Sequence, residues 1–167
     1  MRKASFRLSR STIFTARKLF NSARRVSWHE RLLALEAGLW LGAARIAILI
    51  LPLRRLAPYL GQHMAESPLD DAPEQREFVA AVGRALRTMS HHLPWRCKCL
   101  ERALAGKMLL RRRGISNTLY LGVAKHDENL VDGMKAHAWL RSGSLIVTGA
   151  EGRDRFTIVA SFADERR

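Results

Sequence analysis

The chain has 167 residues, of which 47% are hydrophobic, so it is long enough for one domain with its own core and too apolar to be disordered. Its two cysteines, Cys97 and Cys99, stand one residue apart. This spacing excludes a disulfide framework, and too few ligands lie near them for a zinc site. Such cysteine usage predicts a reducing, cytoplasmic location.

The charge of the chain is strongly basic and unevenly distributed. The formal net charge is +14, and residues 1–60 contain twelve Lys or Arg against two Asp or Glu. Such a surplus either attracts acidic partners or is simply a solvated face. We expect no nucleic acid as a partner, because the chain has no zinc finger and no basic motif interleaved with aromatic residues.

The first 26 residues are basic and rich in Ser and Arg. They do not resemble a secretory signal, because residues such as Arg17 and Arg24 interrupt the apolar region that should follow the basic start. A surface helix and a loose arm both fit this composition.

Residues 27–51 are predicted to form a long helix, because apolar residues recur at helical spacing. Ser27 is the expected N-cap, and Glu30 completes a capping box. Glu36 and Arg45 interrupt the apolar run, so a membrane span is not expected. A buried helix and a helix lying at a membrane surface both stay open.

A shorter helical piece is expected to reach Leu60, and residues 64–75 are predicted to be a linker because turn residues are frequent there. The next helix is predicted over residues 73–91, where Asp71 and Glu74 provide an N-cap signal.

The third helix is predicted to run from Cys97 or Lys98 to Arg113, with Gly114 as its C-cap. The apolar period then changes from 3.6 to 2, which predicts strands over residues 118–125, 134–141, 145–148 and 156–162, with a hairpin turn at residues 142–144. Helices followed by strands indicate an α+β fold with an antiparallel sheet packed on a helix.

One cysteine and one histidine form a candidate nucleophile–base pair. Cys99 lies in the first turn of the third helix, where unpaired N–H groups and the positive helix end favour a thiolate. His137 lies in the middle of a strand between two alanines, which holds the ring rigidly and lets another element approach. By residue type alone, Cys99 as a small buried hydrophobe and His137 as a packed polar residue also fit.

Several runs of residues together resemble one known family. The runs are Pro94-Trp95-Arg96-Cys97-Lys98-Cys99-Leu100-Glu101-Arg102-Ala103-Leu104-Ala105, Leu109-Leu110-Arg111-Arg112-Arg113-Gly114-Ile115, Leu121-Gly122-Val123 and Ala136-His137-Ala138-Trp139. Their combination, over about residues 28–162, resembles the lasso-peptide leader peptidases of the transglutaminase-like superfamily. The resemblance implies a transglutaminase-like, papain-like α+β core at residues 76–167, joined by the linker at 64–75 to a basic helical extension at 1–63.

The resemblance also implies a catalytic triad. It assigns the nucleophile to Cys99, the base to His137 and an accessory position to Cys97. The family's third residue is an Asp about a dozen residues after the His, but this chain has Thr148-Gly149-Ala150 there. We expect the nearby acid Glu151 to orient His137; Asp154 and a dyad without a carboxylate stay open, and a main-chain carbonyl could orient the ring less well.

The implied function is removal of the leader from a lasso-peptide precursor, with no cofactor and no metal. The implied partners are the precursor peptide, a separate leader-recognition protein that docks on the basic extension, and an ATP-dependent cyclase. Two alternatives stay open. One is an acyl transferase on the same fold, and the other is a non-enzymatic basic adaptor that binds a membrane or an acidic protein.

Overall fold

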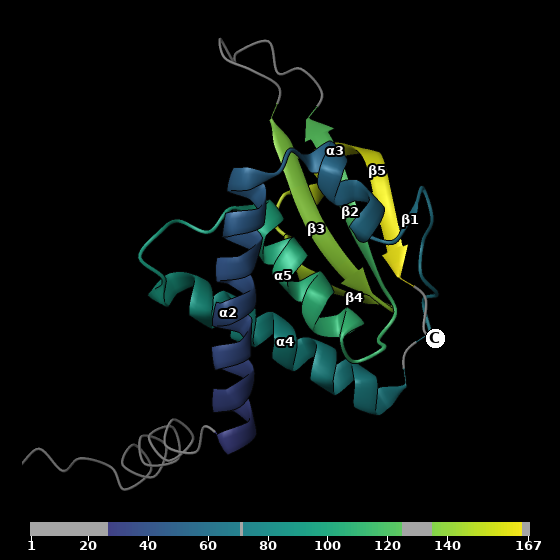
Figure 1. The fold of residues 1–167 in the computed structure, drawn as a ribbon. Helices are drawn as coiled ribbons and strands as arrows, with labels where there is room; N and C mark the ends of the chain where they lie inside the picture. Colours follow the sequence, from purple (N-terminus) through teal and green to yellow (C-terminus); the bar gives the residue numbers. More distant parts are fainter. Residues whose placement is uncertain (1–26, 71, 125–134, 165–167) are drawn as a thin grey trace, which may run out of the picture.

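The computed structural model describes residues 27–70, 72–124 and 135–164. Apart from one two-residue strand, the helices precede the strands along the chain, as predicted, and the α+β fold is confirmed (Figure 1). The elements are α2 (Trp28–Ile50), α3 (Leu53–Leu56), the 3₁₀ turn η1 (Ala57–Tyr59), β1 (Gln62–His63), α4 (Pro73–His92), α5 (Cys99–Arg111), β2 (Asn117–Ala124), β3 (Ala136–Ser142), β4 (Leu145–Thr148), the 3₁₀ turn η2 (Arg153–Arg155) and β5 (Phe156–Asp164).

Helix α2 begins at the predicted capping box. The Ser27 hydroxyl accepts a hydrogen bond from the His29 amide at 3.3 Å, and the Glu30 carboxylate accepts one from the Ser27 amide at 2.9 Å. These contacts satisfy amides that have no partner within the helix. The helix ends at Ile50, two residues before Pro52, whose ring prevents its continuation.

The ends of the other two long helices differ from the sequence prediction. The N-cap of α4 is Ala72, which makes no side-chain cap, so the predicted N-cap Asp71 is one residue early and lies outside the described residues. Pro73 at the first helical position starts this helix instead, because its fixed φ suits that position. The C-cap of α5 is Arg112, and Gly114 follows two residues later with φ of +64°.

The sheet has five strands in the order β1-β5-β2-β3-β4, and all its pairs are antiparallel. The short strand β1, which the sequence analysis missed, pairs Gln62 with Ala163 at one edge. A two-residue strand carries no alternating pattern, so only its partner β5 defines it. The predicted hairpin turn joins β3 to β4, with Gly143 at φ of +50°.

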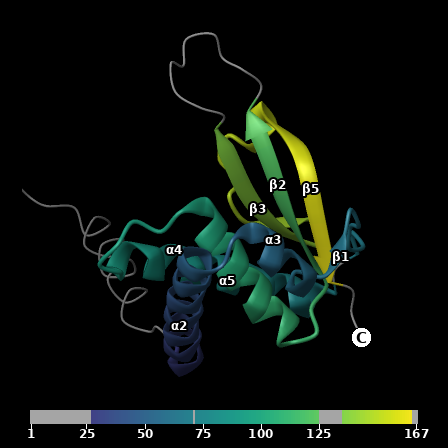
Figure 2. The same cartoon turned by 45° about the horizontal axis from the view of Figure 1, so that its top comes forward.

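The three long helices lie together on one side of the sheet (Figure 2). Helices α4 and α5 contact strands, and α2 packs on both of these helices. One continuous core joins the layers through residues such as Leu41, Leu86, Leu109, Leu119 and Leu140. Residues 27–63 therefore share the core of the rest of the chain; the predicted division into domains stays a prediction.

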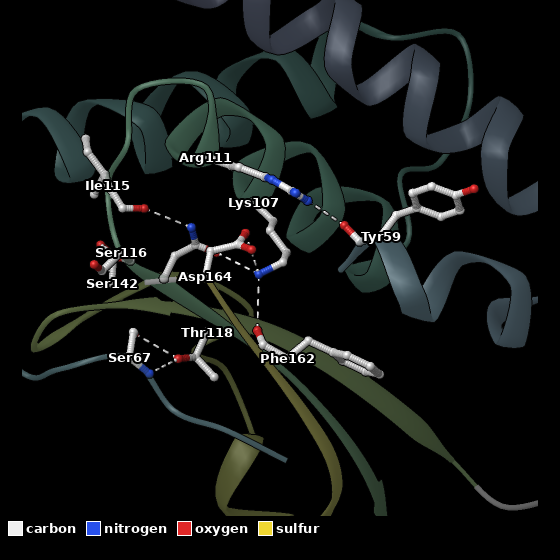
Figure 3. A network of polar contacts seen from close by, with 11 residues as sticks. Tyr59, Ser67, Lys107, Arg111, Ile115, Ser116, Thr118, Ser142, Phe162 and Asp164 are labelled. Carbon is white, nitrogen blue, oxygen red and sulfur yellow. Dashed lines mark hydrogen bonds and ion pairs between the residues drawn. The ribbon is translucent and has the colours of Figure 1, made fainter. Parts of the chain in front are cut away.

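A buried lysine anchors the C-terminal half of α5 to the sheet. The Lys107 ammonium donates to Asn117 Oδ1 at 3.0 Å and to the Phe162 carbonyl at 3.1 Å, and it lies 2.9 Å from Asp164 Oδ2 as an ion pair (Figure 3). Burial lowers the pKa of Lys107, while the Asp164 carboxylate opposes that shift. The contacts hold α5 in register with the ends of β2 and β5.

Candidate active site

Cys99 is the first residue of α5 and is half-buried beside the core. The turn that carries it is held by Glu101, which is fully buried. The Glu101 carboxylate accepts from the Lys98 amide at 3.3 Å and from Arg45 of α2 at 2.7 Å. A buried carboxylate is costly unless it is paired, so these contacts tie the cysteine's turn to α2.

The other cysteine lies two residues earlier, before the helix begins. Burial raises the pKa of the Cys97 thiol, and the Glu101 carboxylate raises it further. The raised pKa leaves Cys97 less thiolate at neutral pH than an ordinary thiol has, which makes it a poorer nucleophile.

His137 lies near the start of β3 between two aromatic rings. Its ring centroid is 5.0 Å from that of Phe156 and 5.8 Å from that of Trp139. Gly122 is its cross-strand partner, and a Cβ at Gly122 would lie 2.9 Å from both of these aromatic side chains. The glycine therefore makes room for the aromatic pair that holds the imidazole.

The orienting contact of His137 is a main-chain one. Its Nε2 atom lies 3.0 Å from the carbonyl oxygen of Gly149. A carbonyl oxygen can only accept, so Nε2 carries the proton and Nδ1 keeps its lone pair. Nδ1 is therefore the atom that can take a proton from a thiol.

Gly149 stands at the position where the family resemblance leads us to expect an acid. Its φ is +73°, and a Cβ there would lie 2.5 Å from the Ala138 carbonyl oxygen and 2.9 Å from Trp139 Cβ. No side chain fits this position without moving β3 or the turn. The turn after β4 therefore presents its backbone, and not a carboxylate, to His137.

The two predicted acids lie in different places. Glu151 is exposed and lines the same cavity as His137. Asp154 lines a separate cavity and makes a 3.5 Å ion pair with Arg153. Neither acid shows a contact with His137 in the described part of the chain. A catalytic role for Glu151 or Asp154 stays a prediction.

Helix α5 and strand β3 run in the same direction. The start of α5, with Cys99, and the start of β3, with His137, are therefore expected at the same end of the contact between the two elements. Arg102 and His137 line one cavity. Further along both elements, a Cβ at Gly106 would lie 2.8 Å from Leu140 Cδ2. Cys99 is one turn before Arg102 and on the same side of the helix, because residues three apart share a face. This spacing predicts that Cys99 lies toward the His137 end of the contact between α5 and β3.

The cavity beside His137 has a volume of about 110 Å³ and carries two arginines that sequence reasoning did not assign to a site. Arg87 comes from α4 and Arg102 from α5. Within the described residues neither guanidinium has an ion-pair partner, and the Arg102 Nε atom is buried without a hydrogen bond. Arg102 was visible as part of the motif after Cys99, but no local signal pointed to Arg87. The cavity suits a negatively charged group.

No cluster of three or more His, Cys, Asp or Glu side chains suited to a metal occurs within residues 27–70, 72–124 and 135–164. His92 contacts the Thr88 carbonyl through Nδ1 at 2.8 Å.

The combination of a cysteine at a helix N-terminus and a strand histidine held by a backbone carbonyl is typical of thiol-dependent acyl-transfer proteins. The chain belongs to the transglutaminase-like superfamily, whose family model matches residues 47–161. Members of this superfamily are usually enzymes, either cysteine peptidases or acyl transferases. No curated protein and no solved structure matches the chain significantly.

Proposed function

We propose that this protein is a cysteine peptidase that removes the leader from a lasso-peptide precursor. The observation that carries the peptidase proposal is the contact between His137 Nε2 and the Gly149 carbonyl. Among the described residues this contact leaves Nδ1 available as a base, and we expect Cys99 to lie at the same end of β3. Thiol catalysis requires at least a nucleophile and a base that can come within hydrogen-bond reach of each other.

The proposed reaction has two steps. The Cys99 thiol attacks the carbonyl carbon at the leader–core junction, and its proton passes to Nδ1 of His137. The tetrahedral intermediate collapses when Nδ1 returns this proton to the leaving amine of the core peptide, and the leader remains bound as a thioester. Water then attacks the thioester and gives its proton to Nδ1, which releases the leader as a carboxylate and restores the thiol.

The first turn of α5 is the natural site for the oxyanion. The amides of the first turn have no partner within the helix, and the helix dipole is positive there. The Cys99 amide is the candidate donor, because it belongs to the residue that attacks. The Glu101 contacts keep this turn in place, since Glu101 binds both the Lys98 amide and Arg45.

The substrate proposal rests on the run from Pro94 to Ile115 and on the Ala136–Trp139 tetrapeptide, which resemble lasso-peptide leader peptidases. We expect the precursor to arrive bound to a separate leader-recognition protein in the cytoplasm, and an ATP-dependent cyclase to close the released core peptide. The surplus of positive charge over residues 1–60 supports docking of an acidic partner by electrostatic attraction.

The test is to incubate the full chain, its leader-binding partner and the candidate precursor, and to identify products by mass spectrometry. We expect a free leader and a free core peptide. Cys99→Ala should form neither product, and the matched variant Cys97→Ser should form both at near the wild-type rate. If Cys97→Ser is inactive and Cys99→Ala is active, the nucleophile is misassigned.

The same assay separates the two alternatives. An added primary amine captured on the leader in place of water would identify an acyl transferase. A Cys99→Ala chain that retains the biological activity of the wild type would identify a non-enzymatic adaptor, because such a protein needs no thiol. For the peptidase, the expected product is the leader with a free carboxylate and no amine adduct.

A further inference from the structure

Helix α2 carries an apolar stripe on the side that faces away from the rest of the protein. Seven large apolar side chains on this helix are between 47% and 76% exposed: Trp28, Leu32, Leu35, Leu39, Ile46, Leu49 and Ile50. They recur every three or four residues, so they share one face of the helix. The opposite face holds the buried residues Leu33, Ala37, Leu41 and Ala44. Helix α2 is thus apolar on both sides, and one side has no cover among the described residues.

The charged residues near the middle of α2 do not interrupt this stripe, because they turn toward α5. Glu36 binds Arg113 at 2.6 Å, and these arginine contacts lower the pKa of the Glu36 carboxyl. Arg45 binds the buried Glu101 at 2.7 Å. The two charges that argue against a membrane span in the sequence are therefore engaged within the protein.

The surroundings of the stripe are basic. Arg31 on α2 and Arg54 and Arg55 on α3 are exposed and have no ion-pair partner among the described residues. The 26 residues that precede α2 in the sequence contain eight Lys or Arg and no Asp or Glu. An apolar helix face bordered by positive charge is the pattern of helices that lie on anionic bilayers.

We propose that α2 lies in the plane of an anionic membrane surface, with its Leu- and Ile-rich stripe in the acyl boundary and the neighbouring arginines on lipid phosphates. Trp28 at the beginning of the stripe fits this position, since tryptophan concentrates at the membrane–water boundary. The proposal does not depend on the peptidase chemistry, but it assigns to lipid part of the positive charge that the proposed function assigns to an acidic partner protein.

Two other arrangements fit the observations less well. A spanning orientation is permitted by length and composition alone, but it would remove the buried face of α2 from α4 and α5 and break the Arg45–Glu101 pair. A second copy of the chain on the stripe would bring two strongly basic regions together, which electrostatic repulsion opposes. An in-plane helix keeps every internal contact and gains the attraction of anionic lipid.

The experiment is co-sedimentation of the full chain with vesicles of phosphatidylcholine, with and without phosphatidylglycerol. We expect binding to the mixed vesicles at low salt, and weaker binding at 0.1 M salt or above, where the screening length is about 10 Å. The double variant Leu35→Gln, Leu39→Gln should bind roughly a hundredfold more weakly, because each leucine transferred to hydrocarbon contributes about a factor of ten. The matched control Leu69→Gln alters a leucine that is 67% exposed outside α2 and should bind as the wild type does.

A second pair of variants tests the electrostatic part. Arg54→Gln with Arg55→Gln should weaken binding roughly 25-fold, since each surface arginine adds about 1 kcal/mol of attraction to anionic lipid, which is roughly fivefold. Arg76→Gln, at an exposed arginine of α4, is the matched control. The proposal is overturned if the chain does not bind mixed vesicles at low salt, or if the Leu35, Leu39 variant binds like Leu69→Gln. It is also overturned if the wild type is a dimer, the Leu35, Leu39 variant is a monomer, and both bind vesicles equally. That result would show that the stripe binds a second copy of the chain.

Discussion

The Nε2 atom of His137 lies 3.0 Å from the carbonyl oxygen of Gly149. In a triad, a carboxylate in this place fixes the tautomer and also stabilises the imidazolium with a full negative charge. A carbonyl fixes the same tautomer but supplies only a partial charge. The contact therefore orients His137 as a base without the negative charge of a third, acidic side chain. The orientation of the ring then depends on the backbone of Gly149 in the turn after β4.

The first prediction concerns this glycine. Gly149→Ala should lower turnover by at least about tenfold, because its Cβ would overlap the Ala138 carbonyl at 2.5 Å and force the turn away from His137. The matched control is Gly152→Ala, where φ is +71° but a Cβ meets nothing within 4 Å. Both variants place an alanine in a left-handed conformation, which costs about 1 kcal/mol. A loss of turnover in Gly149→Ala alone is therefore attributed to the contact between Gly149 and His137. Equal turnover in the two variants would contradict the orienting role.

The second prediction concerns the acids. Glu151→Gln and Asp154→Asn should each keep turnover within about tenfold of wild type, because the Gly149 carbonyl already holds Nε2. A side-chain orienter would instead cost roughly 10²–10⁴-fold when neutralised. Steady-state kinetics of the two variants decides the question. A loss on that larger scale for Glu151→Gln would identify Glu151 as the third catalytic residue.

The third prediction treats Cys99 and His137 as one unit. Cys99→Ala, His137→Ala and the double variant should show the same residual rate, because members of a catalytic unit are not additive. His92→Ala, which alters an exposed histidine whose ring contacts only a helix carbonyl in the described structure, should remain active. Losses that multiply in the double variant would mean that the two residues act separately.

The fourth prediction concerns the arginines of the cavity. Arg87→Gln and Arg102→Gln should raise KM for a peptide with an Asp or Glu beside the cleaved bond, and should affect its Asn or Gln analogue less. The expected change is about ten- to a hundredfold for each arginine, the scale of a hydrogen bond to a charged group. Arg76→Gln, also on α4 but away from the cavity, is the control. Equal changes in KM for the acidic peptide and its amide analogue would show that these arginines do not recognise the negative charge of the substrate.

The fifth prediction concerns pH and stability. The folded pKa of Lys107 is below the ordinary value of 10.5, so the unfolded chain binds more protons between these two pKa values and stability from this group rises with pH there. Lys107→Met should destabilise the protein by about 3 kcal/mol, because Asp164 loses its buried partner. The difference from wild type should widen from neutral pH toward 10.5. Urea unfolding across this range measures it, and Lys135→Met, at an exposed lysine, should show no widening.

Local patterns in the sequence were sufficient for most elements of the fold. The capping box of Ser27 and Glu30 predicted the start of α2, because the two side chains act on amides only three residues away. Apolar alternation predicted four of the five strands. The N-cap of α4 was wrong, since a proline at the first helical position and a polar residue at the cap are competing start signals of similar strength.

The chemistry of the site depended in part on residues that lie far apart in the sequence. The types of Cys99 and His137, and their settings at a helix start and within a strand, could be read from the chain alone. The acceptor for His137 could not, because a backbone carbonyl has no sequence signature and Gly149 reaches it only through the pairing of β3 with β4. The Arg87–Arg102 cavity likewise exists only because α4 and α5 pack side by side.

Charge shows most clearly what the sequence by itself determined and what the tertiary structure decided. The sequence determined that the N-terminal part of the chain is basic and that α2 is long and mostly apolar, because these are properties of composition and period. Only the tertiary structure decided that Glu36 and Arg45 turn toward α5. Long side chains take the direction in which an opposite charge lies, and that direction is set by packing between helices that the sequence separates by more than fifty residues.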